Sequence, residues 1–231
     1  MIMHAASLDA RDFSDIDAWI FDLDNTLYPA SCDLFALIDE RMTAYVGRLV
    51  GCDPVQARAI QKRYFRDHGT TLSGLMALHG TEPRHFLDDV HDIALDRVEH
   101  DARLVEAIAR LPGRKLVFTN GDVDYAQRVL DRIGLGTSFE AIHDIHAMEY
   151  VPKPAPASYA AMCARWDVDP VRALFAEDMA RNLKPAKALG MTTLWIDNGS
   201  EQASEEEFTP FIDYRTAHLS DWLHELTGEM A

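Results

Sequence analysis

Cysteine is scarce in this chain, and the three that occur, Cys32, Cys52 and Cys163, form no C-x-x-C pair. Such scattered cysteines fit neither a disulfide framework nor a zinc site, so we expect buried thiols in a reducing compartment. No apolar run approaches the ~20 residues that span a bilayer, and residues 1–17 are acidic where a secretory signal is basic and apolar. These absences predict a cytoplasmic protein that does not bind membranes.

Positive charge is also in short supply. Twenty-two Lys and Arg residues against 38 Asp and Glu leave a formal charge of −16, which argues against nucleic-acid polymers and anionic lipid surfaces as partners. A small phosphorylated ligand is still compatible, because a few placed cations and a metal can reverse the field locally. At 231 residues and 48% hydrophobic content, the chain is long enough for one sizeable core, with or without an inserted module.

Short apolar runs alternate with segments of helical period along most of the chain. Because these runs are apolar on both faces, they are typical of buried parallel strands. The alternation predicts an α/β fold, a doubly wound parallel sheet with right-handed crossovers and a Rossmann-like core. The predicted strands are residues 18–23, 115–119, 141–145, 173–177 and 192–196, and the predicted helices between and after them are 125–133, 155–166, 182–189 and 219–226.

One interval breaks the alternation. Between residues 31 and 110 no run resembles a strand, and helical patterns occur at 34–50, 54–67 and 84–98. A plain helical bundle domain is one interpretation, but insertion directly after the first strand favours a lid over the sheet's ligand edge. We therefore expect an all-helical cap at 31–110 inserted into a catalytic core of 1–30 and 111–231, and a polar loop at 198–210.

Two carboxylates, Asp22 and Asp24, follow the first predicted strand. Ligands of open α/β sheets bind at this carboxyl end, where one carboxylate can act as a nucleophile and a second as a general acid and base. Two anions facing a phosphate require a cation, and oxygen ligands favour Mg²⁺. An Asx turn that ends a strand is the alternative interpretation of the same pattern.

Polar residues also follow the later predicted strands. Thr119 and Asn120 offer neutral donors that suit phosphate oxygens, although a helix cap and turn would use the same residues. Lys153, one of only five lysines, lies between two prolines and is a candidate phosphate-binding cation, although a lone lysine is usually on the surface.

The last such cluster follows the fourth predicted strand. Asp178 could complete a Mg²⁺ site, with Glu177 or Asn182 holding a metal-bound water or orienting a ligand. Acidic residues at a helix N-terminus explain the same pattern without a metal. All four clusters would meet at one edge of the sheet, which favours the functional interpretation.

In this order, FDLDNTLYP, VFTNGD, VPKPAPASY and FAEDMARNLKPAKALGM resemble the four motifs of the haloacid dehalogenase (HAD) superfamily of phosphatases, over most of the chain. More narrowly, the first motif, the stretches LSGLMALHG and FLDDVHDI, and the FTNGD and EDMARNL forms look like the pyrimidine 5′-nucleotidase branch. The resemblance implies a Mg²⁺-dependent phosphomonoesterase that hydrolyses a small metabolite, foremost a pyrimidine nucleoside 5′-monophosphate, through a phospho-aspartate.

The resemblance also implies a role for each motif residue. Asp22 would be the nucleophile and a metal ligand, and Asp24 the general acid and base and a ligand through its backbone carbonyl. Asp178 would be the third metal ligand. Thr119, Asn120 and Lys153 would bind the phosphate, and Lys153 would also neutralise charge during catalysis.

Two positions test this assignment. Dehalogenases of the superfamily lack a carboxylate where this chain has Asp24, so Asp24 favours phosphoryl transfer. Asn182 stands where many relatives have an acidic residue, and Glu177 could compensate.

Several alternatives stay open. The chain could be a phosphoglycolate or sugar-phosphate phosphatase, a phosphomutase or a non-catalytic metal-binding module, and it could be a monomer or a homodimer. Near the cap entry, candidate contacts to the leaving group are Tyr28, Arg63, His68 and Arg84.

Overall fold

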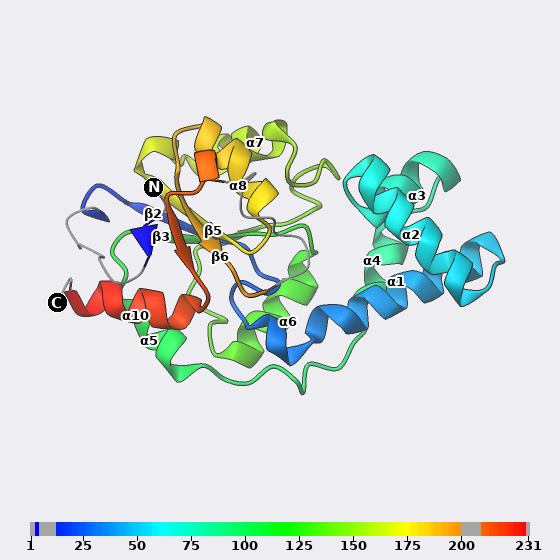
Figure 1. Cartoon of the computed structure of the whole chain (residues 1–231), viewed down its shortest axis with the longest axis horizontal. Coiled ribbons are helices and arrows are strands. Elements are labelled where there is room, and N and C mark those ends of the chain that lie inside the picture. Colours follow the sequence, from blue (N-terminus) through cyan, green and yellow to red (C-terminus); the bar gives the residue numbers. More distant parts are fainter. Residues whose placement is uncertain (1–2, 5–12, 200–208, 230–231) are drawn as a thin grey trace.

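The structure is a computed structural model that describes residues 3–4, 13–199 and 209–229, and Figure 1 shows its arrangement. Within these residues, seven strands form one parallel sheet in the order β1-β7-β6-β5-β2-β3-β4. The predicted α/β fold with a doubly wound parallel sheet is therefore confirmed. The strands are β1 (Met3–His4), β2 (Ala18–Phe21), β3 (Arg114–Phe118), β4 (Ala141–His143), β5 (Ala173–Glu177), β6 (Thr192–Ile196) and β7 (Tyr214–Thr216).

Helices cover both faces of the sheet (Figure 1). On one face lie α7 (Pro156–Trp166) and α8 (Ala180–Ala188), and on the other lie α5 (Ala102–Arg110), α6 (Val123–Ile133) and α10 (Leu219–Glu229). Every residue of β2 and β5 is buried, because these central strands are covered from both sides. The continuous apolar character that suggested buried strands thus reflects their place in the middle of the sheet.

The helical insert forms four helices that lie to one side of the sheet (Figure 1). We name α1 to α4 the cap: α1 (Leu34–Val50), α2 (Pro54–His68), α3 (Thr71–His79) and α4 (Pro83–His91). The expected helix at 84–98 is wrong at its end. The chain leaves helical geometry at Asp92, with φ −75° and ψ 69°, and Arg128 of α6 donates to the carbonyl of His91 at 2.6 Å.

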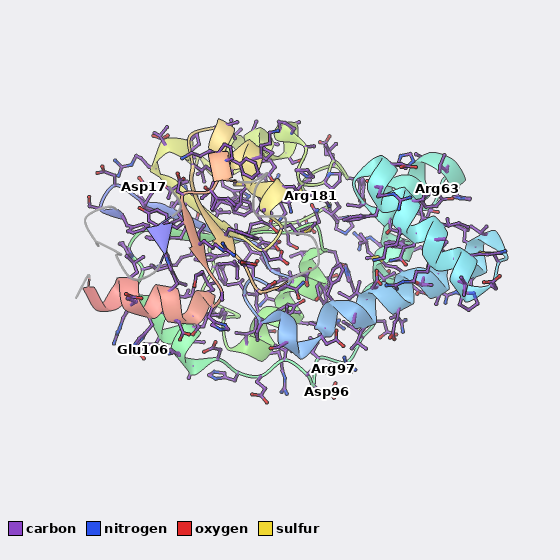
Figure 2. All side chains as sticks on the ribbon, viewed as in Figure 1. Asp17, Arg63, Asp96, Arg97, Glu106 and Arg181 are labelled. Atoms are coloured by element: carbon purple, nitrogen blue, oxygen red, sulfur yellow. The ribbon has the colours of Figure 1, made fainter. Side chains whose placement is uncertain are left out.

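The last helix of the expected insert, α5, packs against α10 beside the sheet. The chain enters and leaves the cap at neighbouring points, where the Arg97 guanidinium donates to the Asp33 carbonyl at 3.1 Å. Figure 2 shows Arg97 on the long return segment between α4 and α5.

Three smaller expectations can be compared with the structure. Cys32, Cys52 and Cys163 are free, but each is half-buried where we expected burial. Across the described ranges, no helix is both long enough and apolar enough to cross a membrane. Much of the expected polar loop, residues 200–208, lies outside the described residues.

Candidate active site

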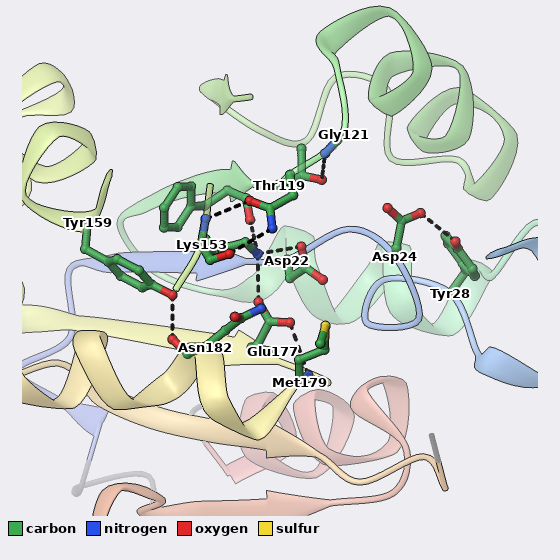
Figure 3. A network of polar contacts seen from close by, with 12 residues as sticks. Asp22, Asp24, Tyr28, Thr119, Gly121, Lys153, Tyr159, Glu177, Met179 and Asn182 are labelled. Atoms are coloured by element: carbon green, nitrogen blue, oxygen red, sulfur yellow. Dashed lines mark hydrogen bonds and ion pairs between the residues drawn. The ribbon is translucent and has the colours of Figure 1, made fainter. Parts of the chain in front are cut away.

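Three neighbouring strands bring the predicted residues to one edge of the sheet. β2 pairs with both β3 and β5, and all three run parallel. Asp22 directly follows β2, Thr119 follows β3, and Glu177 and Asp178 lie at the end of β5. Because parallel strands present their carboxyl ends together, residues far apart in the sequence meet here (Figure 3).

Lys153 lies at the centre of the site, although the sequence alone left a surface position open for it. Only 1% of its side chain is exposed. Its Nζ donates to Asp22 Oδ1 at 2.7 Å, to Glu177 Oε2 at 2.7 Å and to the Phe118 carbonyl at 2.8 Å. An ammonium has three protons to donate, so these contacts satisfy it fully. Burial alone would lower the pKa of Lys153, but Asp22 and Glu177 raise it overall.

The side chain of Asn120 contacts the backbone of Lys153, and its expected role in phosphate binding stays a prediction. Its Nδ2 donates to the Lys153 carbonyl at 3.2 Å, and its Oδ1 accepts from the Lys153 N–H at 2.8 Å. An amide offers two donor hydrogens and an acceptor oxygen, and this pair of contacts uses both ends. The geometry makes Asn120 a support that holds the Lys153 backbone against the end of β3.

Thr119 is buried directly beside Asn120. Its Oγ1 accepts from the Gly121 N–H at 3.0 Å. The hydroxyl proton of Thr119 is still able to donate, because accepting this bond leaves its own O–H unused. Thr119 therefore keeps the donor function expected of it, and Gly121 helps to orient it.

Asp24 lies apart from the other carboxylates and is held by two tyrosines. Asp24 Oδ1 accepts from the Tyr28 hydroxyl at 2.6 Å and from the Tyr125 hydroxyl at 2.7 Å. Burial, followed by the charge of Asp24, raises the pKa of both tyrosines well above their ordinary value. The two hydroxyls thus stay protonated and fix Oδ1 of Asp24.

The remaining acidic residues form a buried cluster. Carboxylate oxygens of Asp22, Glu177 and Asp178 lie within 4.8 Å of one another. Burial, and then the charge of Glu177, raises the pKa of Asp22 well above its ordinary value. Burial and the charges of Glu177 and Asp22 do the same to the pKa of Asp178. Three carboxyl groups surround a single ammonium, so their full ionisation would leave an excess of negative charge.

The donor set of this cluster fits a hard divalent cation. Carboxylate oxygens are ligands that Mg²⁺ prefers, and a cation would offset the excess of negative charge. Glu177 is the least available of the three, because Oε2 accepts from Lys153 and Oε1 from the Met179 N–H at 3.1 Å. Asn182 Oδ1 is buried and has no hydrogen-bond partner in the described part of the chain.

The family model of the haloacid dehalogenase-like hydrolases matches residues 16–190. This chain belongs to that family. The match covers β2, the cap, the strand ends that carry Asp22 and Asp178, and the loop that carries Lys153. The general resemblance seen in the four motifs is therefore confirmed, and the chain is a HAD-like hydrolase.

Relatives of this HAD-like hydrolase include a protein named for phosphate metabolism and a dehalogenase. Phosphate metabolism protein 8 of Saccharomyces cerevisiae is 24% identical over 190 residues, which cover 75% of this chain but only 59% of the yeast protein. The (S)-2-haloacid dehalogenase of Xanthobacter autotrophicus is 29% identical over 206 residues, covering 83% of this chain and 79% of that enzyme. A HAD phosphatase from Thermococcus onnurineus shares the fold, with a TM-score of 0.63 at 17% identity over 94% of this chain and 98% of its own.

The residues near the cap entry that we considered as contacts to the leaving group have different positions. Tyr28 reaches the site through Asp24, whereas Arg63 and Arg84 are exposed on α2 and α4 and His68 packs edge-on against Tyr64 within the cap. Figure 2 shows Arg63 well away from the sheet.

Sequence reasoning missed the contact that joins the cap to the site. The Arg181 guanidinium of α8 lies over the Phe65 ring of α2, 4.6 Å from its centroid, and Figure 2 shows Arg181 on the side of the core that faces the cap. Burial lowers the pKa of Arg181, and its Nε is buried with no hydrogen-bond partner in the described residues. Its place three residues after Asp178 was the available signal.

Proposed function

We propose that this HAD-like hydrolase is a Mg²⁺-dependent phosphomonoesterase that acts on a pyrimidine nucleoside 5′-monophosphate through a phospho-Asp22 intermediate. The observation that carries the proposal is the division of labour between two carboxylates. Asp22 contacts the buried ammonium of Lys153, whereas Asp24 is held by two tyrosine hydroxyls. A nucleophile and a separate proton carrier are what a two-step phosphate transfer requires.

In the first step, Asp22 attacks the phosphorus atom. Because Oδ1 is bound to Lys153, Oδ2 is the oxygen that forms the new bond. As the bond from phosphorus to the leaving oxygen breaks, Asp24 gives its proton to that oxygen, and the leaving group departs as an alcohol. Lys153 and the Thr119 hydroxyl stabilise negative charge around the transferred group.

In the second step, the now ionised Asp24 takes a proton from water. The water oxygen bonds to phosphorus, the bond between phosphorus and Asp22 breaks, and inorganic phosphate leaves. Asp22 returns as a carboxylate and Asp24 as the acid, so atoms and charges balance over the cycle. The two tyrosines hold Asp24 in place for both proton transfers, because both contacts are to the same oxygen.

Asp22 and Asp178 would hold Mg²⁺, together with the backbone carbonyl of Asp24. When bound, the ion would neutralise phosphate charge as a Lewis acid. Glu177 would not bind the ion, because its two oxygens accept from Lys153 Nζ and from the Met179 N–H. Asn182 is available to orient a ligand of the ion through its unpartnered Oδ1.

The cap in this proposal is α1 to α4, and α5 belongs with the core because it packs on α10. Arg181 and Phe65 support a nucleotide as substrate. A guanidinium three residues after Asp178, with an N–H that has no partner in the described residues, and the aromatic ring of the cap on which it lies suit a planar leaving group that carries oxygen acceptors. A pyrimidine base has both properties, whereas phosphoglycolate has no ring.

The test is phosphate release from UMP, CMP, AMP, GMP, phosphoglycolate and ribose 5-phosphate, each with Mg²⁺ and with EDTA. A parallel assay measures halide release from (S)-2-chloropropionate, because one relative is a haloacid dehalogenase. We expect phosphate release that needs Mg²⁺ and favours UMP and CMP.

Other outcomes would separate the alternatives. Preference for phosphoglycolate or the sugar phosphate would keep the chemistry and refute the nucleotide, and phosphate moved to a second hydroxyl would indicate a mutase. Halide release without phosphate release would refute phosphoryl transfer. No release from any compound, with an Asp22→Asn chain that keeps its biological activity, would favour a non-catalytic binding module.

A further inference from the structure

A histidine of the cap contacts the tyrosine that holds Asp24. His91, the last residue of α4, stacks on the ring of Tyr125 with 4.3 Å between ring centroids and 11° between ring planes. The Tyr125 hydroxyl, at the other end of the same ring, donates to Asp24 Oδ1 at 2.7 Å. His91 and Tyr125 are both buried, so the ring of His91 forms one wall of the space in which Tyr125 sits.

Two further contacts from the core bind His91. Its Nδ1 pairs with Asp122 Oδ2, and its backbone carbonyl accepts from Arg128 at 2.6 Å. Asp122 also caps α6, because its Oδ1 accepts from the Tyr125 N–H at 2.8 Å. One carboxylate therefore fixes both the His91 ring and the backbone of Tyr125, and these contacts come from a single turn of α6 and its cap.

We propose that His91 is a positioning residue for Asp24, acting through Tyr125, so that the proton carrier is aligned only when the end of α4 is seated on α6. This inference rests on the proposed function, because it concerns the proton that Asp24 gives to the leaving group. Loss of the His91 ring frees Tyr125 to rotate, and Asp24 then loses one of its two hydroxyl donors.

The chemistry predicts a specific symptom. A poor leaving group, such as an alkoxide, needs the proton from Asp24, whereas 2,4-dinitrophenolate leaves without one. A variant with a misplaced Asp24 therefore loses activity on an alkyl phosphate and keeps most of it on 2,4-dinitrophenyl phosphate. A merely structural defect would lower both rates alike.

The experiment measures kcat/KM of the full chain with Mg²⁺ on 2,4-dinitrophenyl phosphate and on the best alkyl ester of the panel above. kcat/KM reports the steps up to departure of the leaving group. We expect His91→Ala to lower kcat/KM on the alkyl ester at least about tenfold more than on the dinitrophenyl ester, within the range of general acid catalysis. Tyr125→Phe, which removes only the hydroxyl, should give the same pattern.

His85→Ala is the matched control. His85 lies on the same helix, and its Nδ1 shares a hydrogen bond of 2.8 Å with the Tyr45 hydroxyl, but this pair lies within the cap. We expect its ratio of the two rates to equal that of wild type. If His91→Ala does not fold, as judged by circular dichroism, His91→Gln replaces it, because glutamine also lacks the stacked ring.

Further outcomes decide the inference. A double variant His91→Ala/Tyr125→Phe should lose little more than either single variant, because both act on one path. Equal losses on the two esters, an unchanged ratio in Tyr125→Phe, or fully additive losses would overturn the role of His91. If the wild-type chain hydrolyses neither ester, the proposed function fails instead, and the two failures are distinguishable.

Discussion

Lys153 in the core and Lys62 in the cap both bind carboxylates at hydrogen-bonding distance, but solvent reaches them very differently. Lys153 is 1% exposed and binds Asp22 and Glu177 at 2.7 Å. Lys62 is 44% exposed and binds Asp39 at 2.8 Å. If Asp39 is removed, water can solvate the Lys62 ammonium in its place. Water cannot do the same for the buried Lys153 ammonium if Asp22 or Glu177 is removed.

The pKa values of the carboxylates differ in the same way. Burial raises the pKa of Asp22 in spite of Lys153. Burial also acts on Asp39, but the contacts from Lys62 and its neighbours lower the pKa of Asp39 overall. Asp39 is thus paired within the cap, whereas full ionisation of the core carboxyl groups would leave more negative charge than Lys153 offsets. A bound divalent cation would offset that excess.

The sharpest test of this contrast replaces one carboxylate in each region. Asp22→Asn should lower kcat for phosphate release at least about 10⁴-fold, because an amide is not a competent nucleophile. Asp39→Asn in the cap should leave kcat close to wild type. Steady-state assays of both variants, with circular dichroism to confirm folding, provide the comparison. Substantial turnover by purified Asp22→Asn would contradict the phospho-Asp22 mechanism.

The next largest effect is on stability. Lys153→Met leaves Asp22 and Glu177 buried without their cation and should lower the free energy of unfolding by about 3–5 kcal/mol. Lys62→Met, with the same change of side chain, should cost at most about 1 kcal/mol. Urea unfolding in EDTA measures both without interference from a bound metal.

A double variant checks the cause of that loss. Adding Asp22→Asn to Lys153→Met removes one of the two unpaired charges and should recover part of the stability. If the double variant is less stable than Lys153→Met alone, unpaired charge is not the reason for the loss.

Much of the core was predictable because its signal is local. The strands at 173–177 and 192–196 have the predicted bounds, since buried central strands are apolar on both faces. The short strands β1 and β7 were missed, because edge strands of two or three residues carry too little pattern. The helix α4 was predicted too long, because the Arg128 contact that accompanies its end comes from a distant helix.

The candidate site likewise contains residues that local motifs predicted and contacts that only the fold reveals. Motif order indicated that Asp22, Lys153 and Asp178 would meet at one sheet edge, and the structure places them there. The contact of Tyr125 with Asp24 spans 101 residues, and the contact of Asn120 with the Lys153 backbone spans 33. No local pattern reveals such pairs, so the residues that hold the reacting groups emerge only from the fold.

Buried histidine gives a third test, through pH. Burial, followed by the charge of Arg165, lowers the pKa of His143 in β4 from 6.5 to about 4. Between pH 6.5 and 4, His143 therefore binds a proton in the unfolded chain but not in the folded chain. The free energy of unfolding falls as the pH drops through this range. The full loss is about 3 kcal/mol.

His143→Leu removes this titration and should flatten the decline of stability between pH 6.5 and 4 relative to wild type. Urea unfolding at several pH values measures the difference. The wild-type curve of stability against pH is compared with the His143→Leu curve by subtraction. This is necessary because the raised pKa values of Asp22 and Asp178 increase the stability of both chains as the pH falls. Parallel curves would show that His143 does not titrate differently in the two states.

The smallest effect compares one helical glycine of the cap with one helical glycine of the core. A Cβ on Gly74 of α3 would lie 2.5 Å from the Tyr64 Cβ of α2, whereas one on Gly228 of α10 would meet nothing within 4 Å. Alanine favours either helix by up to about 1 kcal/mol, but the clash should make Gly74→Ala destabilising by about 1–3 kcal/mol. Gly228→Ala should be neutral or stabilising. Urea unfolding of the two variants measures the difference. Equal stabilities would mean that α2 and α3 move apart to accommodate the added Cβ, so that the packing between these two cap helices is not tight.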